Sequence, residues 1–201
     1  PILNIAKDAA SLAVNPDAGD EVTYKITISH DTDGTVPDST ATAYDVHFVD
    51  TLPAYADLQI GTVSVTGAGA ATVNNMSNDG ANRVEVSISD IPIGTTVTIE
   101  YKATLTSAPA PNQLIQNTGN IDWTSQSGNN NPGFTNGERD GSGGVNDYTK
   151  SDTGDLTAAN VTPIKFIMAT SESHTTDPAI LPDPANDTAL NPRPLAIGEI
   201  M

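Results

Sequence analysis

Three polar residues, Lys7, Asp50 and Asn117, stand on strand faces that the sequence otherwise fills with apolar side chains. In an extended chain, residues two apart point to the same side, so apolar neighbours at that spacing predict a buried face. Burying a lone amine or carboxyl group is costly, whereas three such groups can compensate one another if they meet. The apolar residues that share these faces are Leu3, Ile5, Val46, Phe48, Ile115 and Ile121. The sequence therefore predicts a buried cluster of an amine, a carboxyl group and an amide.

The same three groups could react with one another. Burial lowers the pKa of a lysine, and the uncharged amine of Lys7 would then be a nucleophile. The side-chain amide of Asn117 is a poor electrophile, but the protonated carboxyl group of Asp50 could polarise its carbonyl and carry the proton. Loss of one ammonia molecule would leave an isopeptide bond between the first strand and a late strand.

A purely structural interpretation of these residues is also open. Lys7 could extend its amine to the sheet edge, Asp50 could cap the turn that follows it, and Asn117 could bond to the backbone in a bulge. Buried polar groups are usually hydrogen-bonded without further chemistry. The mass of the intact chain distinguishes the two interpretations, because the cross-link removes one ammonia.

Alternating apolar and polar residues predict the strands that would position these groups. In one of them Tyr44, Val46, Phe48 and Asp50 share a face. The segments predicted as strands are Pro1–Lys7, Val22–Ile28, Ala43–Asp50, Leu58–Thr66, Arg83–Ser89, Thr96–Thr106, Leu114–Thr124 and Asp155–Thr162. No segment resembles a long amphipathic helix, so we expect an all-β fold.

Two acidic loops are candidate calcium sites. Residues 126–150 are rich in Gly and Asn and are predicted to be an insertion, because structureless stretches of this length in compact domains are usually functional or mobile. Calcium binds about six to eight oxygen ligands, which carboxylates and the carbonyls of Gly-rich loops can supply. The candidate ligands are Glu138, Asp140, Asn146 and Asp147 in the insertion and Asp31, Asp33 and Asp38 in an earlier loop. Neither loop has the EF-hand spacing, and solvated acidic turns are the alternative for each. The insertion is the favoured site of the two.

Composition excludes several classes of function. A net charge of −17 argues against binding nucleic acid or anionic lipid, since both require clustered Lys and Arg. The chain has no cysteine, which excludes disulfides, thiolate catalysis and zinc–thiolate sites. No apolar run approaches the roughly 20 residues of a membrane-spanning helix, so we expect no direct membrane insertion. The three histidines, His30, His47 and His174, form no catalytic or zinc motif, and we expect no enzymatic activity.

The end of the chain resembles its beginning. Pro163 and Ile164, followed by Ile167, match Pro1 and Ile2 followed by Ile5, and a proline-containing stretch with Gly and Glu recurs later in both segments. Such self-similarity is typical of repeat arrays. We therefore predict one domain over residues 1–162 and, over 163–201, a Pro-rich linker with the first strands of a next repeat. The chain is then expected to be a piece of a longer polypeptide.

A series of segments resembles a known family. In order they are LNIAKDA, PDAGDEVTYKITI, ATAYDVHFVDTLP, IPIGTTVTIEYKATL and IQNTGNIDWTS, within Pro1–Ser125. They resemble the conserved repeat of large bacterial surface proteins and adhesins known as domain of unknown function eleven; the insertion departs from the short form of that family. The resemblance implies an immunoglobulin-like β-sandwich, extracellular at the bacterial cell surface, repeated in tandem as a stalk whose partners are neighbouring repeats.

The architecture is also similar to Gram-positive pilin and collagen-adhesin domains, in which spontaneous isopeptide bonds occur. By position, this likeness implies that Lys7 is the nucleophile, Asn117 the acceptor and Asp50 the proton shuttle. The leading hypothesis is a mechanical spacer that holds a distal ligand-binding domain away from the cell. The alternatives are a calcium-dependent ligand-binding module and a filament subunit whose segment 163–201 is donated as a strand to the next molecule.

Overall fold

The chain forms only β-strands and turns in the part that the structure describes. This computed structural model describes residues 1–12, 16–34, 38–67, 71–75, 81–106, 109–128 and 148–160. Within these ranges there are ten strands and no helix, which confirms the predicted all-β class. Accordingly, none of the described segments is a helix with the length and apolarity to span a membrane.

The first sheet has five antiparallel strands in the order β1-β2-β8-β4, with β5 also paired to β8. Val, Ile and Thr dominate its long central strands, as expected for residues that favour extended backbone. Its strands are β1 (Leu3–Leu12), β2 (Glu21–His30), β8 (Thr96–Leu105), β4 (Ala56–Leu58) and β5 (Ser64–Thr66).

The second sheet is also antiparallel, in the order β10-β9-β3-β7-β6. Its strands are β10 (Thr149–Thr157), β9 (Leu114–Thr124), β3 (Ala43–Thr51), β7 (Arg83–Ile91) and β6 (Ala71–Asn75). Strands that are neighbours in sequence often lie in different sheets, so the chain crosses repeatedly between the layers.

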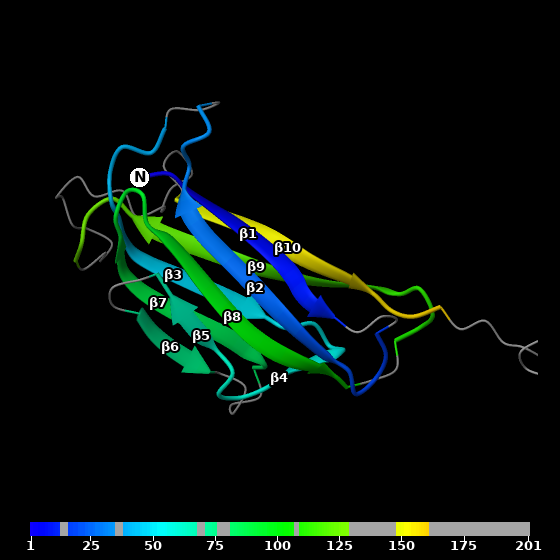
Figure 1. Ribbon diagram of the computed structural model, residues 1–201. Coiled ribbons are helices and arrows are strands. Elements are labelled where there is room, and N and C mark those ends of the chain that lie inside the picture. Colours follow the sequence, from blue (N-terminus) through cyan, green and yellow to red (C-terminus); the bar gives the residue numbers. More distant parts are fainter. Residues whose placement is uncertain are drawn as a thin grey trace, which may run out of the picture. The chain divides into compact units, whose positions relative to one another are not determined.

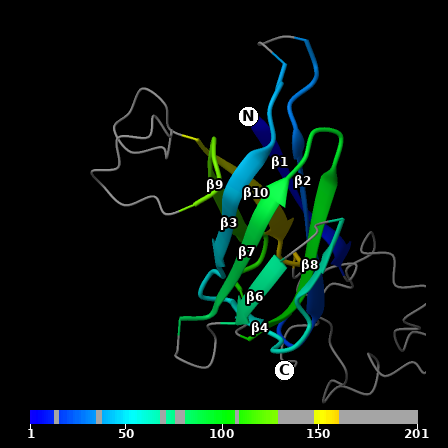
Figure 2. The same cartoon turned by 90° about the vertical axis from the view of Figure 1, so that its left-hand side faces the viewer.

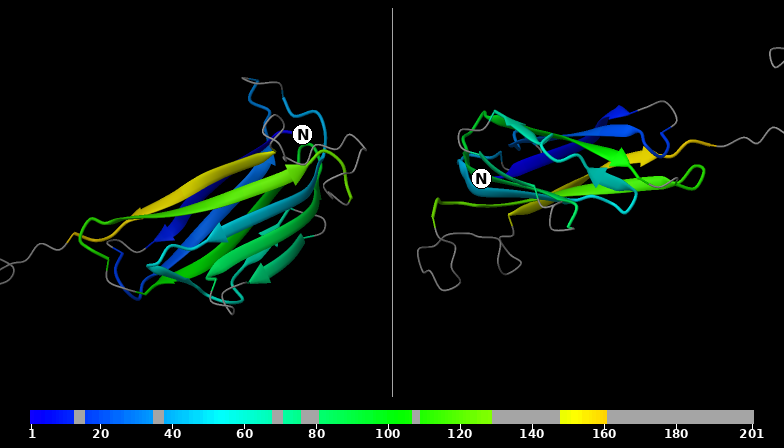
Figure 3. Two further views of the ribbon diagram at one scale, coloured as in Figure 1. Left: turned by 180° about the vertical axis from the view of Figure 1, so that it is seen from behind. Right: turned by 90° about the horizontal axis from the view of Figure 1, so that it is seen from below.

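The two sheets pack face to face (Figure 1), and the quarter-turn of Figure 2 and the view from below in Figure 3 show them as two layers. Alternate residues of the long strands point into the space between them, where they form one apolar core. This arrangement confirms the predicted immunoglobulin-like β-sandwich. The core also encloses the polar site described below.

The edge strands β1 and β10 lie beside one another and close one side of the sandwich. The backbone N–H of Lys7 in β1 donates to a carboxylate oxygen of Asp152 in β10 at 2.7 Å. This bond gives the exposed edge of β1 a partner from the other sheet, although the two strands form no ladder. It also holds the backbone of Lys7 close to the second sheet.

The predicted face of Tyr44 is wrong. Val46, Phe48 and Asp50 are buried as expected, but at the start of β3 the buried residue is Ala43, while Tyr44 is only partly covered. The register between β3 and β9 shifts at this point, and Asp45 has a φ of 48°. A bulge of this kind inserts one residue, so alternation before it runs out of phase with alternation after it.

Two predicted strands differ from the observed ones, and one observed strand was not predicted. The segment 58–66 is not one strand, because a turn with Gly61 at a φ of +83° separates β4 from β5. Strand β6 was not predicted. The last strand runs over Thr149–Thr157 and not Asp155–Thr162, so it begins within the predicted insertion. Its first residues are polar and exposed, which is why they resemble a loop in sequence.

The chain divides into two compact units, Pro1–Asn160 and Val161–Met201. The sandwich is the first unit. The second lies outside the described residues, as does most of the insertion, residues 129–147. The assignment of residues 163–201 to the next repeat therefore stays a prediction.

Candidate cross-link site

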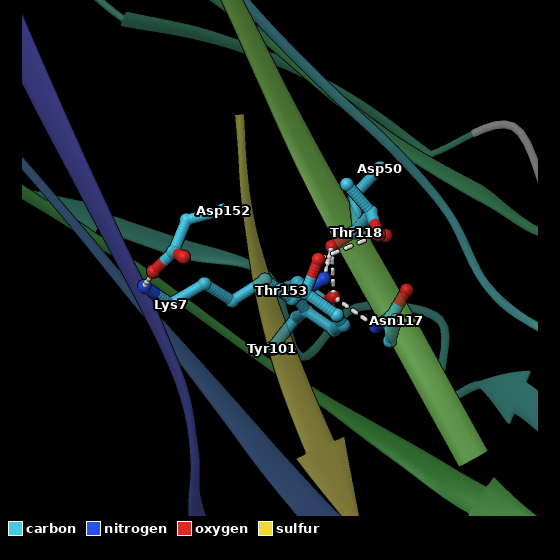
Figure 4. Close-up of polar contacts among 7 residues, drawn as sticks. All are labelled: Lys7, Asp50, Tyr101, Asn117, Thr118, Asp152 and Thr153. Carbon is cyan, nitrogen blue, oxygen red and sulfur yellow. Dashed lines mark hydrogen bonds and ion pairs between the residues drawn. The ribbon is translucent and has the colours of Figure 1, made fainter. Parts of the chain in front are cut away.

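The three residues of the predicted polar cluster come from three strands and both sheets. Lys7 lies in the middle of β1, Asp50 near the end of β3, and Asn117 in β9. All three are buried, with exposed fractions of 2%, 0% and 1%. Figure 4 shows the Lys7 side chain reaching inward to the place where Asp50 and Asn117 converge.

Lys7 and Asp50 are in direct contact across the core. The lysine Nζ donates to Asp50 Oδ2, and neither side chain is exposed to solvent. Burial lowers the pKa of Lys7 even though Asp50 opposes the shift. Burial likewise raises the pKa of Asp50 against the effect of the lysine. Both shifts favour a neutral amine beside a neutral carboxyl group, which is the protonation state that nucleophilic attack requires.

Tyr101, in β8, connects this pair to Asn117. Its hydroxyl donates to Asp50 Oδ2 and accepts a hydrogen bond of 2.9 Å from Asn117 Nδ2. Tyr101 lies in the predicted strand Thr96–Thr106, where its position between Ile99 and Ala103 in the alternation indicates an inward face, but no role in the site was predicted for it. The available signal was its type, because a buried tyrosine needs a partner for its hydroxyl.

Two acceptor atoms in the site have no hydrogen-bond partner within the described residues. They are Asp50 Oδ1 and Asn117 Oδ1. Unpaired buried acceptors are costly, so they call for an explanation. The neutral carboxyl group that the raised pKa of Asp50 favours lowers this cost, because a buried neutral group loses less hydration than a buried carboxylate.

Glycine and aromatic residues pack around the aliphatic stem of Lys7. A Cβ on Gly119 would lie 2.8 Å from the Phe48 ring and 3.5 Å from Lys7 Cδ. A Cβ on Gly154 would lie 3.3 Å from Lys7 Cγ. The Lys7 amine lies 5.0 Å from the centroid of the Tyr24 ring. The lysine is therefore confined to a path that leads its amine into the core.

In the described part of the acidic loop, residues 31–34 and 38, two carboxylates accept hydrogen bonds from backbone N–H groups of the same loop. Asp31 Oδ1 accepts from the N–H of Asp33 at 3.4 Å, and Asp38 Oδ1 accepts from the N–H of Gly34 at 3.0 Å. These bonds tie the carboxylates to their own loop. Across the described part of the chain, no three His, Asp or Glu residues form a group that could hold a metal. The candidate ligands of the insertion, Glu138, Asp140, Asn146 and Asp147, lie outside the described residues, so calcium binding stays a prediction.

A buried Ser–His pair was also missed by the sequence analysis. His30 Nδ1 lies 2.6 Å from Ser39 Oγ, and His30 Nε2 lies 2.8 Å from the carbonyl oxygen of Ile91. Ser39 Oγ also accepts from the N–H of Ile2. These bonds connect Ile2 near the N-terminus, the loop residue Ser39 and the last residues of β2 and β7, and both side chains are buried. The pair therefore holds the N-terminus and this loop against one end of the sandwich.

The fold resembles solved structures of bacterial surface proteins. A variant of BcpA, the major pilin subunit of Bacillus cereus, matches 80% of this chain at 16% identity with a TM-score of 0.50. The full-length major pilin SpaD of Corynebacterium diphtheriae matches 77% at 15% identity and a TM-score of 0.46. The N-terminal domain of the Streptococcus gordonii adhesin Sgo0707 matches 80% at 16% identity and 0.46. At 16% identity, the likeness to BcpA shows the fold alone.

This chain corresponds to only part of each of those proteins, covering 41% of the BcpA chain, 34% of SpaD and 33% of the Sgo0707 domain. No protein-family model matches the sequence. No curated protein matches it either.

Proposed function

We propose that this chain is a non-enzymatic structural module of a bacterial surface pilus or adhesin, locked internally by an isopeptide bond between Lys7 and Asn117. The observation that carries the proposal is the continuous hydrogen-bonded path from Lys7 through Asp50 and Tyr101 to Asn117 inside the core. The fold shared with pilins and an adhesin, together with the sequence resemblance to conserved surface repeats, supports the location at the cell surface.

The proposed bond follows from ordinary amide chemistry. The neutral Lys7 amine attacks Cγ of Asn117, a new C–N bond forms, and Nδ2 leaves as ammonia. The amine loses one proton and the leaving nitrogen gains one, so no oxidant or cofactor is needed. Burial supplies the neutral nucleophile and excludes the water that would compete with it.

The bond would suit a load-bearing stalk because it joins β1 of one sheet to β9 of the other. Unfolding the sandwich requires these strands to separate, and a covalent link prevents that separation. The chain has no cysteine, so a disulfide cannot serve the same purpose. In the chain-entropy model, a cross-link that closes a loop of about 100 residues stabilises the folded state by about 4–5 kcal/mol.

Intact-mass spectrometry of the purified chain tests the cross-link. The wild type should be lighter than its sequence mass by one ammonia, whereas Lys7→Ala and Asn117→Ala should have their full sequence masses. A wild-type mass equal to the sequence mass refutes the cross-link. The surface location is tested separately: antibodies against the folded domain should label intact cells of the source organism, and labelling only after lysis would refute it.

A further inference from the structure

The leaving nitrogen of the proposed reaction needs a proton donor, and Asp50 does not contact it. Asp50 Oδ2 contacts Lys7 Nζ and the Tyr101 hydroxyl, and Asp50 Oδ1 has no hydrogen-bond partner within the described residues. The hydrogen bond that Asn117 Nδ2 makes runs to the Tyr101 hydroxyl at 2.9 Å. In Figure 4 the hydroxyl lies between the carboxyl group and the amide.

We propose that Tyr101 is a catalytic residue of the cross-linking reaction, passing a proton from Asp50 to the departing nitrogen of Asn117. This inference rests on the proposed cross-link and adds the route by which its proton travels. It assigns Asp50 the task of taking the proton from Lys7, and Tyr101 the task of delivering one to ammonia.

The direction of the hydrogen bond between Asn117 and Tyr101 must reverse during the reaction. In the resting amide, the Nδ2 lone pair is conjugated with the carbonyl, so the nitrogen can only donate. Attack of Lys7 makes Cγ tetrahedral and ends this conjugation, after which Nδ2 is a basic amine that can accept. The hydroxyl lies at the correct distance to donate to it without any movement of the backbone.

The protons and bonds balance along this route. Lys7 Nζ, as the neutral amine, forms its bond to Cγ and then carries one surplus proton. The neutral Asp50 gives the proton on Oδ2 to the Tyr101 oxygen while the hydroxyl gives its own proton to Nδ2. The bond between Cγ and Nδ2 breaks, the carbonyl re-forms and ammonia leaves. Nζ then returns its surplus proton to Oδ2, so Asp50 and Tyr101 end in their starting states.

Burial suits Tyr101 to this role. Desolvation, with the Asp50 carboxyl group beside it, raises the pKa of Tyr101 well above its usual value. The hydroxyl therefore stays protonated and can relay a proton without becoming an anion. Tyr148 offers a comparison, because its ring stacks on that of Trp123 with the centroids 5.7 Å apart and it makes none of the contacts described for the site.

The test measures how fast the full chain loses ammonia after cell-free synthesis. Samples are quenched in denaturant at intervals, and their intact masses are measured by mass spectrometry. Tyr101→Phe keeps the ring and removes the hydroxyl, and it should slow the reaction by about 100-fold or more, as loss of a general acid does. Tyr148→Phe is the matched control and should react at nearly the wild-type rate. A solvent deuterium isotope effect should be large in the wild type and reduced in Tyr101→Phe, which a packing role for the hydroxyl would not produce.

The outcomes separate this inference from the cross-link itself. If the wild type never loses ammonia, both the cross-link and the proton relay through Tyr101 are refuted. A wild type that cross-links while Tyr101→Phe matches its rate, or while Tyr148→Phe is slowed equally, refutes the relay and leaves the cross-link standing. If Tyr101→Phe does not fold, difluorotyrosine placed at position 101 keeps the shape and makes the hydroxyl more acidic. The relay then predicts a changed rate, and an unchanged rate refutes it.

Discussion

Lys7 and Asp50 form an ion-pair contact between the two sheets in which neither side chain is exposed to solvent. Such a pair is a weak source of stability in itself, because desolvation offsets most of the attraction, but removal of one member leaves the other buried without compensation. The contact also brings a nucleophile and a proton acceptor together in a dry site.

Lys7→Met should destabilise the sandwich strongly. The variant loses the cross-link and leaves the Asp50 carboxyl group unpaired in the core, and the second effect alone costs about 3–5 kcal/mol. Lys25→Met is the matched control. Lys25 pairs with Glu100 at 3.9 Å on the surface, where both side chains are about half exposed, so its loss should cost less than about 1 kcal/mol. Urea unfolding of both variants measures the difference, and equal losses would contradict a buried reactive pair.

The stability of Lys7→Met should fall as pH rises from acidic values. Burial raises the folded-state pKa of Asp50 above its ordinary value of 3.8, so above that pH the folded state holds a proton that the unfolded state has released. Stability falls with pH wherever the folded state binds more protons, and levels off above the folded-state pKa. Urea unfolding across this range measures the slope. Lys7→Met/Asp50→Asn should lack it, and a slope that persists in this double variant would assign the effect to another group.

Gly119→Ala should destabilise the fold and impair cross-linking together. The added Cβ would lie 2.8 Å from the Phe48 ring, so the ring must shift beside the lysine stem, whose Cδ lies at an ordinary contact distance of 3.5 Å from the same Cβ. Overpacking of this kind costs about 1–3 kcal/mol. Phe48→Leu makes room for the methyl group, so Gly119→Ala should cost less in that background. Thermal unfolding and intact mass are measured for the wild type, the two single variants and the double variant, which together form a double-mutant cycle. Strictly additive effects would show that the Phe48 ring is not the obstacle.

Any stabilisation by calcium should come from the insertion. The carboxylates of Asp31 and Asp38 already accept backbone hydrogen bonds within their own loop. We therefore expect calcium to raise the melting temperature of the wild type and of Asp31→Asn by similar amounts, and to have little effect on Asp140→Asn. Thermal unfolding with calcium or with a chelator measures this difference. A melting temperature that is the same in both conditions for the wild type would end the calcium hypothesis.

Sequence alternation was sufficient to predict the inward faces of Lys7, Asp50 and Asn117, because each lies in a strand without a bulge between it and its apolar neighbours. It failed at Tyr44, where the register shift reverses the phase. It also failed for β10, whose first residues are polar and exposed. Two-residue periodicity predicts which side chains face inward, but only where the strand pairing has no register shift.

The role of Tyr101 could not be predicted in the same way. Its face was evident from the alternation in β8, but its partners come from β3 and β9 in the opposite sheet. Which inward residues meet depends on how the two layers are aligned, and no pattern within one strand encodes this alignment. Partners for Asp50 and Asn117 could therefore be proposed by type only, and the hydroxyl between them was missed.

Tandem mass spectrometry of a proteolytic digest of the wild-type chain can detect the bond between Lys7 and Asn117 itself. The proposed cross-link requires one branched peptide in which the segment with Lys7 is joined to the segment with Asn117, lighter than the sum of the two by one ammonia, and absent from the Asp50→Ala digest. Two separate linear peptides with Lys7 and Asn117 unmodified in the folded wild-type protein would contradict it.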